Sequence, residues 1–384
     1  MDFKNVHVLV TDGGGRQTLT IIRGLKEIGC HVTVLCRSKM DLCYVSKYPD
    51  VKLMEKDIIG DDSFYKVILR ELKTEKYDVL FPIAENSTNL VTLHEEEYKK
   101  YVRIACAPRD IYIRAFNKQI TFETAMKAGI PCPITRRDNE TIEDFLNRTP
   151  FPIIIKPRNG VGSIGFHKFD SRIEFERFLV DQKTNVEDYV VQEFIHFTKR
   201  RSAFIVMDEK GNVKGALAGE IKRWYPVDAG TCTCLQTVDD NVVLDYAIKL
   251  LQEMRWKGFA NVCFMTDDND GIVKLLEING RINASIKLCF MCGYNISKQM
   301  LELAFGEPVT RYPINDKFGV TTRHFQADFM WFLKSPNRFN SDPSWFSWKN
   351  TKDIVFYRDD PLPFFAYSFE QMTRYKKAMK KRER

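Results

Sequence analysis

The sequence lacks any hydrophobic stretch that could cross a membrane. No apolar run reaches about 18 residues, so we expect no transmembrane helix. The residues from Met1 to Asn5 lead directly into a strand-like run and do not have the form of a secretory signal. The ten cysteines are scattered without an even framework, as is typical of chains in a reducing compartment. We therefore expect a cytoplasmic protein.

The sequence also has little net charge outside its last residues. The formal net charge is +7, and the last eleven residues alone hold seven Lys or Arg and one Glu. The rest of the chain is close to neutral, so we expect no nucleic-acid partner. Phe369, Met372, Tyr375 and Met379 recur at helical spacing beside these charges and predict a terminal helix packed on the body. The alternative is contact of the basic tail with a membrane surface or an acidic partner.

Strands and helices alternate over about the first 115 residues. Apolar runs typical of buried strands occupy residues 6–10, 31–35 and 78–83, with helical patterns between them. This alternation predicts a parallel sheet covered by helices on both faces. Three glycines follow the first strand, but Thr18 stands where a dinucleotide-binding turn needs glycine. We therefore expect this helix N-terminus to bind an anion at most, and not a dinucleotide.

The rest of the chain has a different pattern. Hairpin-like segments at 202–220 and 260–278 predict a mixed α+β region that is largely antiparallel. Residues 311–384 hold 17 aromatic residues among 74, about twice the average of the chain. This is not the composition of a solvated linker. We expect the aromatic stretch to pack on the body.

Three segments carry residue types suited to binding a nucleoside polyphosphate. Lys118 opens a helix, and Lys156 ends a strand and is followed by a loop with three glycines. The amides of such a loop can close over phosphate oxygens while a lysine neutralises their charge. The strand end at 192–195 can pair through its backbone with the edge of an adenine.

Glu277, Asn279 and Arg281 alternate along a later strand. Side chains two residues apart on a strand share a face. Oxygen ligands of this kind suit Mg²⁺ held between protein and phosphates, and Arg281 is placed to stabilise an anion formed during phosphoryl transfer. The structural alternative is that Glu277 forms an ion pair with Arg281 or a neighbouring lysine.

In their order and spacing these segments resemble the ATP-grasp superfamily, over roughly residues 5–310. The run at 257–264 and the Glu-x-Asn strand after it are most similar to the carboxylate–amine ligase and carbamoyl-phosphate-synthetase-like branch. The resemblance implies an α/β domain followed by an α+β domain. The implied division is a Rossmann-like preATP-grasp domain at 1–115, an ATP-grasp domain at 116–310 with a mobile lid at about 135–195, and an extension with a basic tail at 311–384.

The resemblance also implies which residues bind ATP. Two lysines and the glycine loop would contact the phosphates, and the strand end would line the adenine pocket. The residues concerned are Lys118, Lys156, Gly162, Ser163, Gln192, Glu193, Phe194 and Ile195.

Further roles follow from the same resemblance. Glu277 and Asn279 would hold Mg²⁺, or Mn²⁺ in its place, and Arg281 would be the catalytic residue that faces the transferred phosphoryl group. Glu85 lies at a strand end that faces the substrate crevice in such folds. Arg223 either binds a substrate carboxylate or faces water.

Three positions depart from the pattern of the superfamily. Cys263 stands where many relatives have a further metal ligand, so a second Mg²⁺ is not implied. Gly280 replaces the common proline of the Asn-Pro-Arg motif, and Lys199 stands near the place of a ribose-binding glutamate.

The activity implied is that of an ATP-dependent ligase. Such an enzyme activates a small carboxylate as an acyl phosphate and joins it to an amine or similar nucleophile. The alternative is a non-catalytic ATP-binding regulatory or scaffold protein of the same fold. Relatives are often dimers, so a homodimer is also expected.

Overall fold

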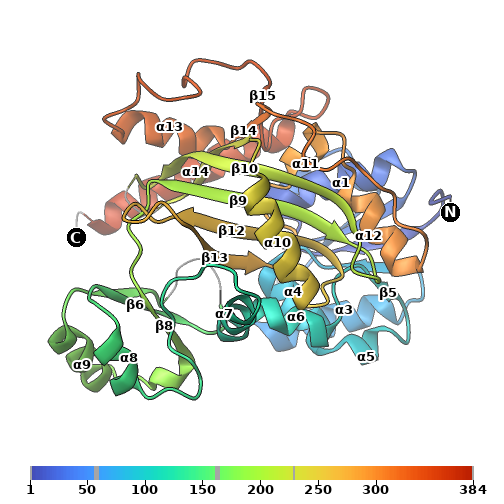
Figure 1. The fold of residues 1–384 in the computed structure, drawn as a ribbon. Helices are drawn as coiled ribbons and strands as arrows, with labels where there is room; N and C mark the ends of the chain where they lie inside the picture. Colours follow the sequence, from blue (N-terminus) through green and yellow to red (C-terminus); the bar gives the residue numbers. More distant parts are fainter. Residues whose placement is uncertain (1, 56–59, 161–164, 228–229, 383–384) are drawn as a thin grey trace.

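The computed structural model describes residues 2–55, 60–160, 165–227 and 230–382. Within these ranges the strands form sheets of five, seven and three strands (Figure 1). The candidate site lies where elements of all three sheets meet.

The five-stranded sheet is parallel and has helices on both faces. Its strand order is β3-β2-β1-β4-β5. Alternation along β1 sends Val8 and Val10 into one core with α1, and Leu9 into another core with α3 and α4. The elements are β1 His7–Val10, α1 Arg16–Glu27, β2 His31–Cys36, α2 Leu42–Val45, β3 Val51–Met54, α3 Asp61–Leu72, β4 Val79–Phe81, α4 Glu85–Leu93, α5 Glu95–Tyr98 and β5 Arg103–Ile104.

The seven-stranded sheet has the order β13-β12-β9-β10-β11-β14-β15 and is antiparallel except at β14–β15. The two predicted hairpins are present as β9–β10 and β12–β13. The strands are β9 Lys199–Met207, β10 Val213–Tyr225, β11 Thr231–Thr237, β12 Gly258–Thr266, β13 Val273–Asn279, β14 Thr321–Arg323 and β15 Thr351–Asp353. The last two come from the aromatic stretch, which therefore extends the sheet as well as packing on it.

The two faces of this sheet bury different cores. Phe204 and Val206 of β9 join the core that contains Val8 and Val10 of the first sheet. Ala203 and Ile205 face the opposite way, into a core with three helices. These helices are α6 Arg109–Phe116, α7 Lys118–Lys127 and α10 Asn241–Glu253. One face of the sheet is thus turned toward the five-stranded sheet and its helices, which together are called the first domain below.

The three-stranded sheet forms a small body of its own, seen at the lower left of Figure 1. Phe145, Ile155, Phe175 and Val191 belong to its separate core. Its elements are α8 Ile142–Arg148, β6 Ile153–Pro157, β7 His167–Phe169, α9 Arg172–Asp181, the 3₁₀ turn η1 Val186–Asp188 and β8 Tyr189–Glu193. Lys156 therefore reaches the site from this body.

Helices α11 (Lys287–Met291) and α12 (Ile296–Phe305) join the first domain to the large sheet. Gly24 of α1 lies against both, because a Cβ there would come within 2.5 Å of Phe290 and 2.7 Å of Ser297. The Ser297 hydroxyl also donates to the Ile21 carbonyl at 2.9 Å. Close helix contact thus holds the two domains together.

A buried ion cluster anchors the C-terminal stretch to the large sheet. Asp328 of α13 (Phe325–Lys334) accepts from Arg223 Nε at 2.8 Å and from Arg323 Nε at 2.8 Å. Arg223 is 1 % exposed, so both expectations for it, a substrate carboxylate and water, are wrong. Its partner lies over a hundred residues away in the sequence, and no local pattern shows the pairing.

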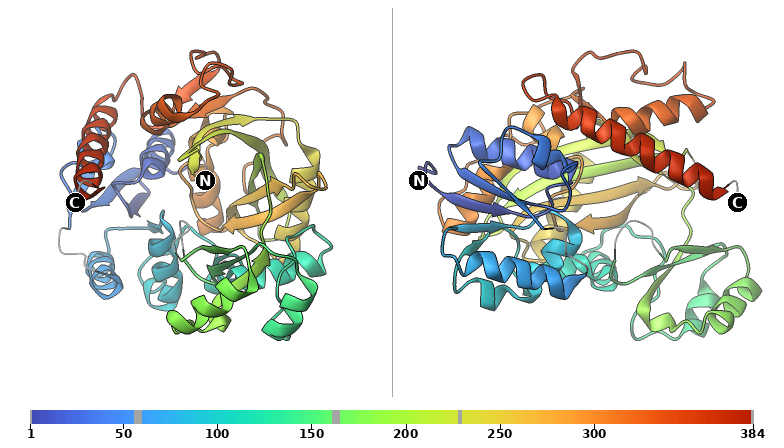
Figure 2. Two further views of the ribbon diagram at one scale, coloured as in Figure 1. Left: turned by 90° about the vertical axis from the view of Figure 1, so that its left-hand side faces the viewer. Right: turned by 180° about the vertical axis from the view of Figure 1, so that it is seen from behind.

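The basic tail is helical, in α14 (Leu362–Arg382), which runs beside α2 on the first domain (Figure 2). The expected docking stripe is wrong where it can be tested, because Phe369 and Met372 are each 62 % exposed. The helix packs instead through Phe364 and Tyr367. The side chains of the last part of the stripe lie outside the described residues.

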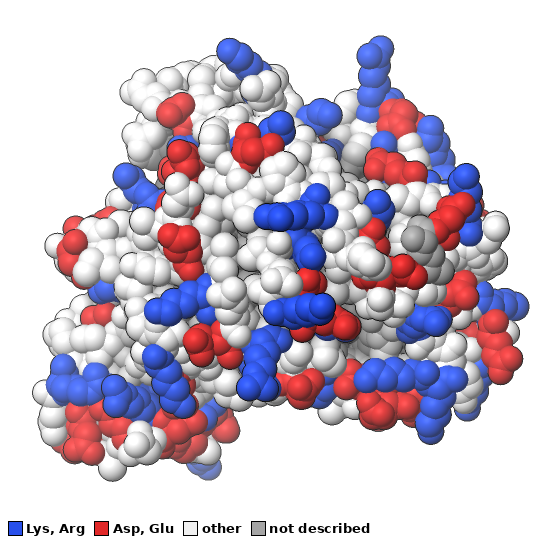
Figure 3. All heavy atoms as spheres, turned by 45° about the vertical axis from the view of Figure 1, so that its right-hand side comes forward, with Lys and Arg blue, Asp and Glu red and all other residues white. Residues whose placement is uncertain are grey.

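The face of the molecule shown in Figure 3 carries charges of both signs. Basic and acidic side chains are interspersed over the face shown in Figure 3, with no single-sign field across it. No helix in the described part of the chain is long and apolar enough to span a membrane.

The ion cluster makes a stability prediction. Replacing Asp328 by Asn leaves two buried guanidinium groups without a carboxylate, so the free energy of unfolding should fall by about 3–5 kcal/mol. The matched control is Asp170→Asn, which removes an exposed pair with Lys168 and should cost below about 1 kcal/mol. Urea unfolding measures both. Equal losses would show that the buried cluster does not anchor the stretch.

Candidate functional site

The candidate site lies where β13 ends, beside the first turn of α7, strand β6 and the start of α4. Lys118 begins α7, and the preceding Asn117 caps this helix by accepting from Gln119 N and Ile120 N. Lys156 lies on β6 and Glu85 begins α4. The structure thus brings together side chains that are far apart in the sequence.

The register of β12 and β13 sets the acidic part of the site. Asn261 lies opposite Asn279 and Cys263 lies opposite Glu277, so these four side chains share one face. The Asn279 amide donates to Glu277 Oε1 at 3.1 Å. Among the ion pairs of the described residues, none involves Glu277, so the structural alternative for this carboxylate is not what the structure shows.

Cys263 is a neutral thiol in this setting. Burial, helped by the nearby Glu277 carboxylate, raises the pKa of Cys263 to about 12. Its Sγ donates to Asn261 Oδ1 at 3.3 Å. A protonated thiol is a poor ligand for a hard cation, so the face offers one carboxylate and amide oxygens. Within the described ranges no group of three or more His, Cys, Asp or Glu side chains is placed to hold a metal.

The two lysines form the basic part of the site. The pKa of Lys156 is lowered to about 8, chiefly by burial and in addition by the charge of Lys118, while Glu277 opposes the shift. The Lys156 ammonium lies 4.4 Å from the centre of the Phe122 ring. Lys118 donates to the Gly160 carbonyl at 2.8 Å, and burial lowers its pKa as well. Two crowded, half-buried cations favour an anionic ligand between them.

Arg281 is held by the first domain. Its Nε donates to Glu85 Oε2 at 2.6 Å, and Tyr112 OH donates to Glu85 Oε1 at 3.0 Å. Sequence reasoning missed Tyr112, because a tyrosine on an amphipathic helix looks like an ordinary core residue. The pair ties the end of β13 to the start of α4.

Gly280 has a packing reason that the sequence does not show. A Cβ at this position would come within 2.5 Å of the Trp256 ring and 3.3 Å of Ala115 Cβ. The chain therefore passes close over Trp256 just before Arg281. Proline, common here in the superfamily, does not fit this contact.

The side chains at the strand end 192–195 form hydrogen bonds with the neighbouring segment 134–135. Gln192 Nε2 donates to Thr135 Oγ1 at 2.7 Å, and Glu193 Oε1 accepts from Ile134 N at 2.8 Å. Ile195 is buried, and the Phe194 ring meets His196 edge-on. The side chains of Gln192 and Glu193 thus fasten the strand, while Gly162 and Ser163 lie outside the described residues.

The sequence is similar to those of several known proteins. Residues 115–285 match the family described as the ATP-grasp domain. A D-aspartate ligase of Enterococcus faecium is 25 % identical over 60 % of this chain and 59 % of its own length. A carbamoyl phosphate synthase large chain of Pyrococcus furiosus is 22 % identical over 68 % of this chain and 27 % of its own length. The chain therefore spans about three fifths of the first relative and about a quarter of the second.

Solved structures show the same fold. The biotin carboxylase domain of Hydrogenobacter thermophilus 2-oxoglutarate carboxylase has a TM-score of 0.68, with 16 % identity over 82 % of this chain and 73 % of that one. That structure is a domain dimer with MgADP, ADP and bicarbonate. The mixed α/β architecture of this chain is thus an ATP-grasp fold.

The Lys156 environment can be tested directly. After reductive ¹³C-methylation, the Lys156 signal, assigned by its loss in Lys156→Met, should titrate near pH 8, because burial disfavours the ammonium. In Glu277→Gln the midpoint should fall further, since the carboxylate that supports the ammonium is gone. Carbon NMR follows the titration. A midpoint near the ordinary lysine value of 10.5 would contradict the assigned environment.

Proposed function

We propose that this chain, whose residues 115–285 form an ATP-grasp domain, is an ATP-dependent ligase. It activates a small carboxylate as an acyl phosphate and joins it to an amine, releasing ADP and phosphate. The proposal rests on one observation: four charged side chains lie together at the end of β13, those of Lys118, Lys156, Glu277 and Arg281. Phosphoryl transfer needs mainly positioning and charge neutralisation from a protein, and these residues provide both.

The nucleotide site that we propose extends from β6 to β8. Lys118 and Lys156 would neutralise the phosphates. Adenine would lie against Phe194 and the Ile195 backbone, because the side chains of Gln192 and Glu193 are already engaged in fastening β8. Phosphate contacts from Gly162 and Ser163 stay a prediction.

Glu277 and Asn279 fit one Mg²⁺, or Mn²⁺ in its place. The carboxylate is outside any ion pair in the described part of the chain, and the amide lies on the same face. Mg²⁺ in such sites needs only one or two protein oxygens besides the phosphates and water, whereas Cys263 is unsuited as a further ligand. When bound, the metal would neutralise charge on the transferred phosphoryl group.

Arg281 would face the phosphoryl group and the acyl phosphate as the catalytic cation. Glu85 holds its guanidinium through Nε, so we assign Glu85 first to positioning Arg281. Contact of Glu85 with the substrate stays a prediction.

We assign residues 1–115, which contain the five-stranded sheet, to a Rossmann-like preATP-grasp domain. We assign residues 116–310 to the ATP-grasp domain, with the small body at about 135–195 as its lid, and residues 311–384 to an extension that adds β14 and β15 to the large sheet. The dimer of the Hydrogenobacter domain supports a homodimer for this chain as well.

The test is ADP release with a panel of carboxylates and amines that includes D-aspartate, the amino acid in the name of the Enterococcus relative. ADP should appear only when both a carboxylate and an amine are present. Glu277→Ala should lower kcat by about 100-fold or more, because charge stabilisation by the metal is lost. The control Glu253→Ala changes an exposed carboxylate on α10 and should keep activity.

Two results would contradict the ligase. One is turnover that does not depend on either substrate, and the other is full activity in Glu277→Ala. ATP binding by calorimetry without ADP from any pair would support the alternative, a non-catalytic ATP-binding protein, which the loss of a ligand at Cys263 also favours.

A further inference from the structure

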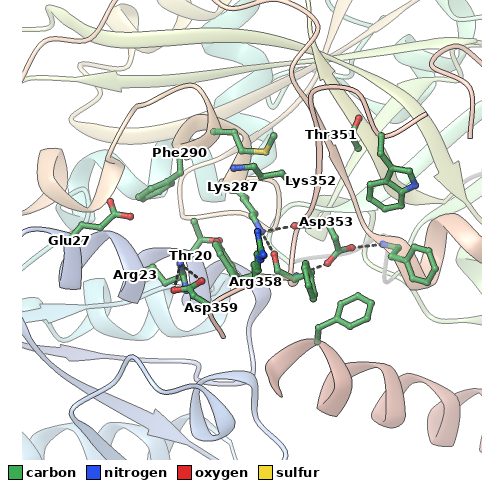
Figure 4. Close-up of a pocket in the computed structure, with 16 residues that line it drawn as sticks. Thr20, Arg23, Glu27, Lys287, Phe290, Thr351, Lys352, Asp353, Arg358 and Asp359 are labelled. Atoms are coloured by element: carbon green, nitrogen blue, oxygen red, sulfur yellow. Dashed lines mark hydrogen bonds and ion pairs between the residues drawn. The ribbon is translucent and has the colours of Figure 1, made fainter. Parts of the chain in front are cut away.

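A cavity of about 810 Å³ lies apart from the site described above (Figure 4). It is enclosed by α1, α11, α13, the segment 348–359 and the start of α14. Every lining residue falls outside 115–285, so the cavity is not part of the matched ATP-grasp domain. Its volume is typical of sites for small molecules.

Four cationic side chains line the cavity, those of Arg23, Lys287, Lys352 and Arg358. Lys287 is 3 % exposed and donates to the Asp353 carbonyl at 2.6 Å and the Phe356 carbonyl at 2.9 Å. The pKa of Lys287 is lowered to about 7, chiefly by burial and in addition by the charges of Arg23 and Lys352, while Asp353 and Asp359 oppose the shift. These like charges repel one another, so an anion among them would be favoured.

The acids that line the cavity are largely engaged elsewhere. The Asp353 carboxylate accepts from three backbone N–H groups, those of Phe325, Val355 and Phe356, at 2.7–2.8 Å. Asp359 accepts from Arg23 at 3.1 Å and from the Tyr48 hydroxyl.

The third acid, Glu27, lies at the edge of the view in Figure 4. Lys352 and Arg358 have no ion-pair partner among the residues that the structure describes, and the buried Arg23 Nη1 has no hydrogen-bond partner. Cationic donors therefore remain for a ligand.

Aromatic rings form the rest of the wall. Trp348 and Phe356 are 47 % and 41 % exposed, although they line a concave site. Phe325 and Phe364 pack beside them, with ring centres 6.1 Å apart. Exposed rings in a cavity offer stacking surface to a planar group.

We propose that this cavity binds a small molecule that carries a planar ring and an anionic group, a carboxylate or a phosphate. The ring would lie against Trp348 and Phe356, and the anion would face Lys352, Arg358 and Lys287. This site is separate from the proposed ligase site, and its test does not depend on ligase activity.

Calorimetry with three ligands of one ring tests the proposal. The probes are 1-naphthoate, 1-naphthyl phosphate and the neutral 1-naphthamide. At least one anion should bind with a Kd below about 1 mM, and the amide should bind about tenfold more weakly or worse. Whichever of the two anions binds with the lower Kd shows whether the site prefers a carboxylate or a phosphate. If neither anion binds below about 1 mM, or the amide binds equally well, the proposal is overturned.

Variants place the binding in the cavity. The double variant Lys352→Met with Arg358→Met removes two exposed charges. It should weaken binding of the anionic probe by about tenfold or more and leave the free energy of unfolding unchanged. Lys66→Met, an exposed lysine on α3, is the matched surface control, and Lys156→Met controls for the proposed nucleotide site. Both should bind as the original chain does. Loss of binding in Lys156→Met, or unchanged binding in the double variant, would place the ligand elsewhere and refute the proposal.

Discussion

The pairing of β12 with β13 is the constraint on which the proposed site depends. Its register puts Glu277 and Asn279 on one face with Asn261 and Cys263, and a shift of β13 by one residue would turn Glu277 and Asn279 to the opposite face. Close passage of Gly280 over Trp256 then directs Arg281 to Glu85 of the first domain. One strand end therefore fixes both the proposed metal ligands and the arginine.

The sequence was sufficient for what is local. The period of two predicted the shared face of Glu277 and Asn279, whereas Arg281 lies beyond the end of β13. Apolar runs predicted the two hairpins and the parallel alternation of the first domain. The features that the sequence did not predict depend on contacts with residues that are distant in the sequence. From its local sequence Arg223 looks like an exposed strand residue, because its partner Asp328 lies far away in the sequence, on α13. The tail stripe was misassigned because Phe364 and Tyr367, five residues before Phe369 and Met372 and on a different face of the helix, pack on the first domain instead.

The C-terminal stretch has a larger structural role than its composition suggested. It adds β14 and β15 to the large sheet and buries one carboxylate between two arginines. Together with α1 and α11 it encloses the cationic, aromatic cavity. Because α11 begins six residues after Arg281, the chain that forms the proposed active site continues directly into the wall of this cavity.

If the proposed site is right, the nucleotide and its metal are held at the end of β13. A crystal structure with adenylyl imidodiphosphate and Mg²⁺ is the decisive experiment. We expect Mg²⁺ on the carboxylate of Glu277 and the amide oxygen of Asn279, with phosphate oxygens at Lys118 and Lys156. A nucleotide bound elsewhere, or a metal at the phosphates without Glu277, would contradict it.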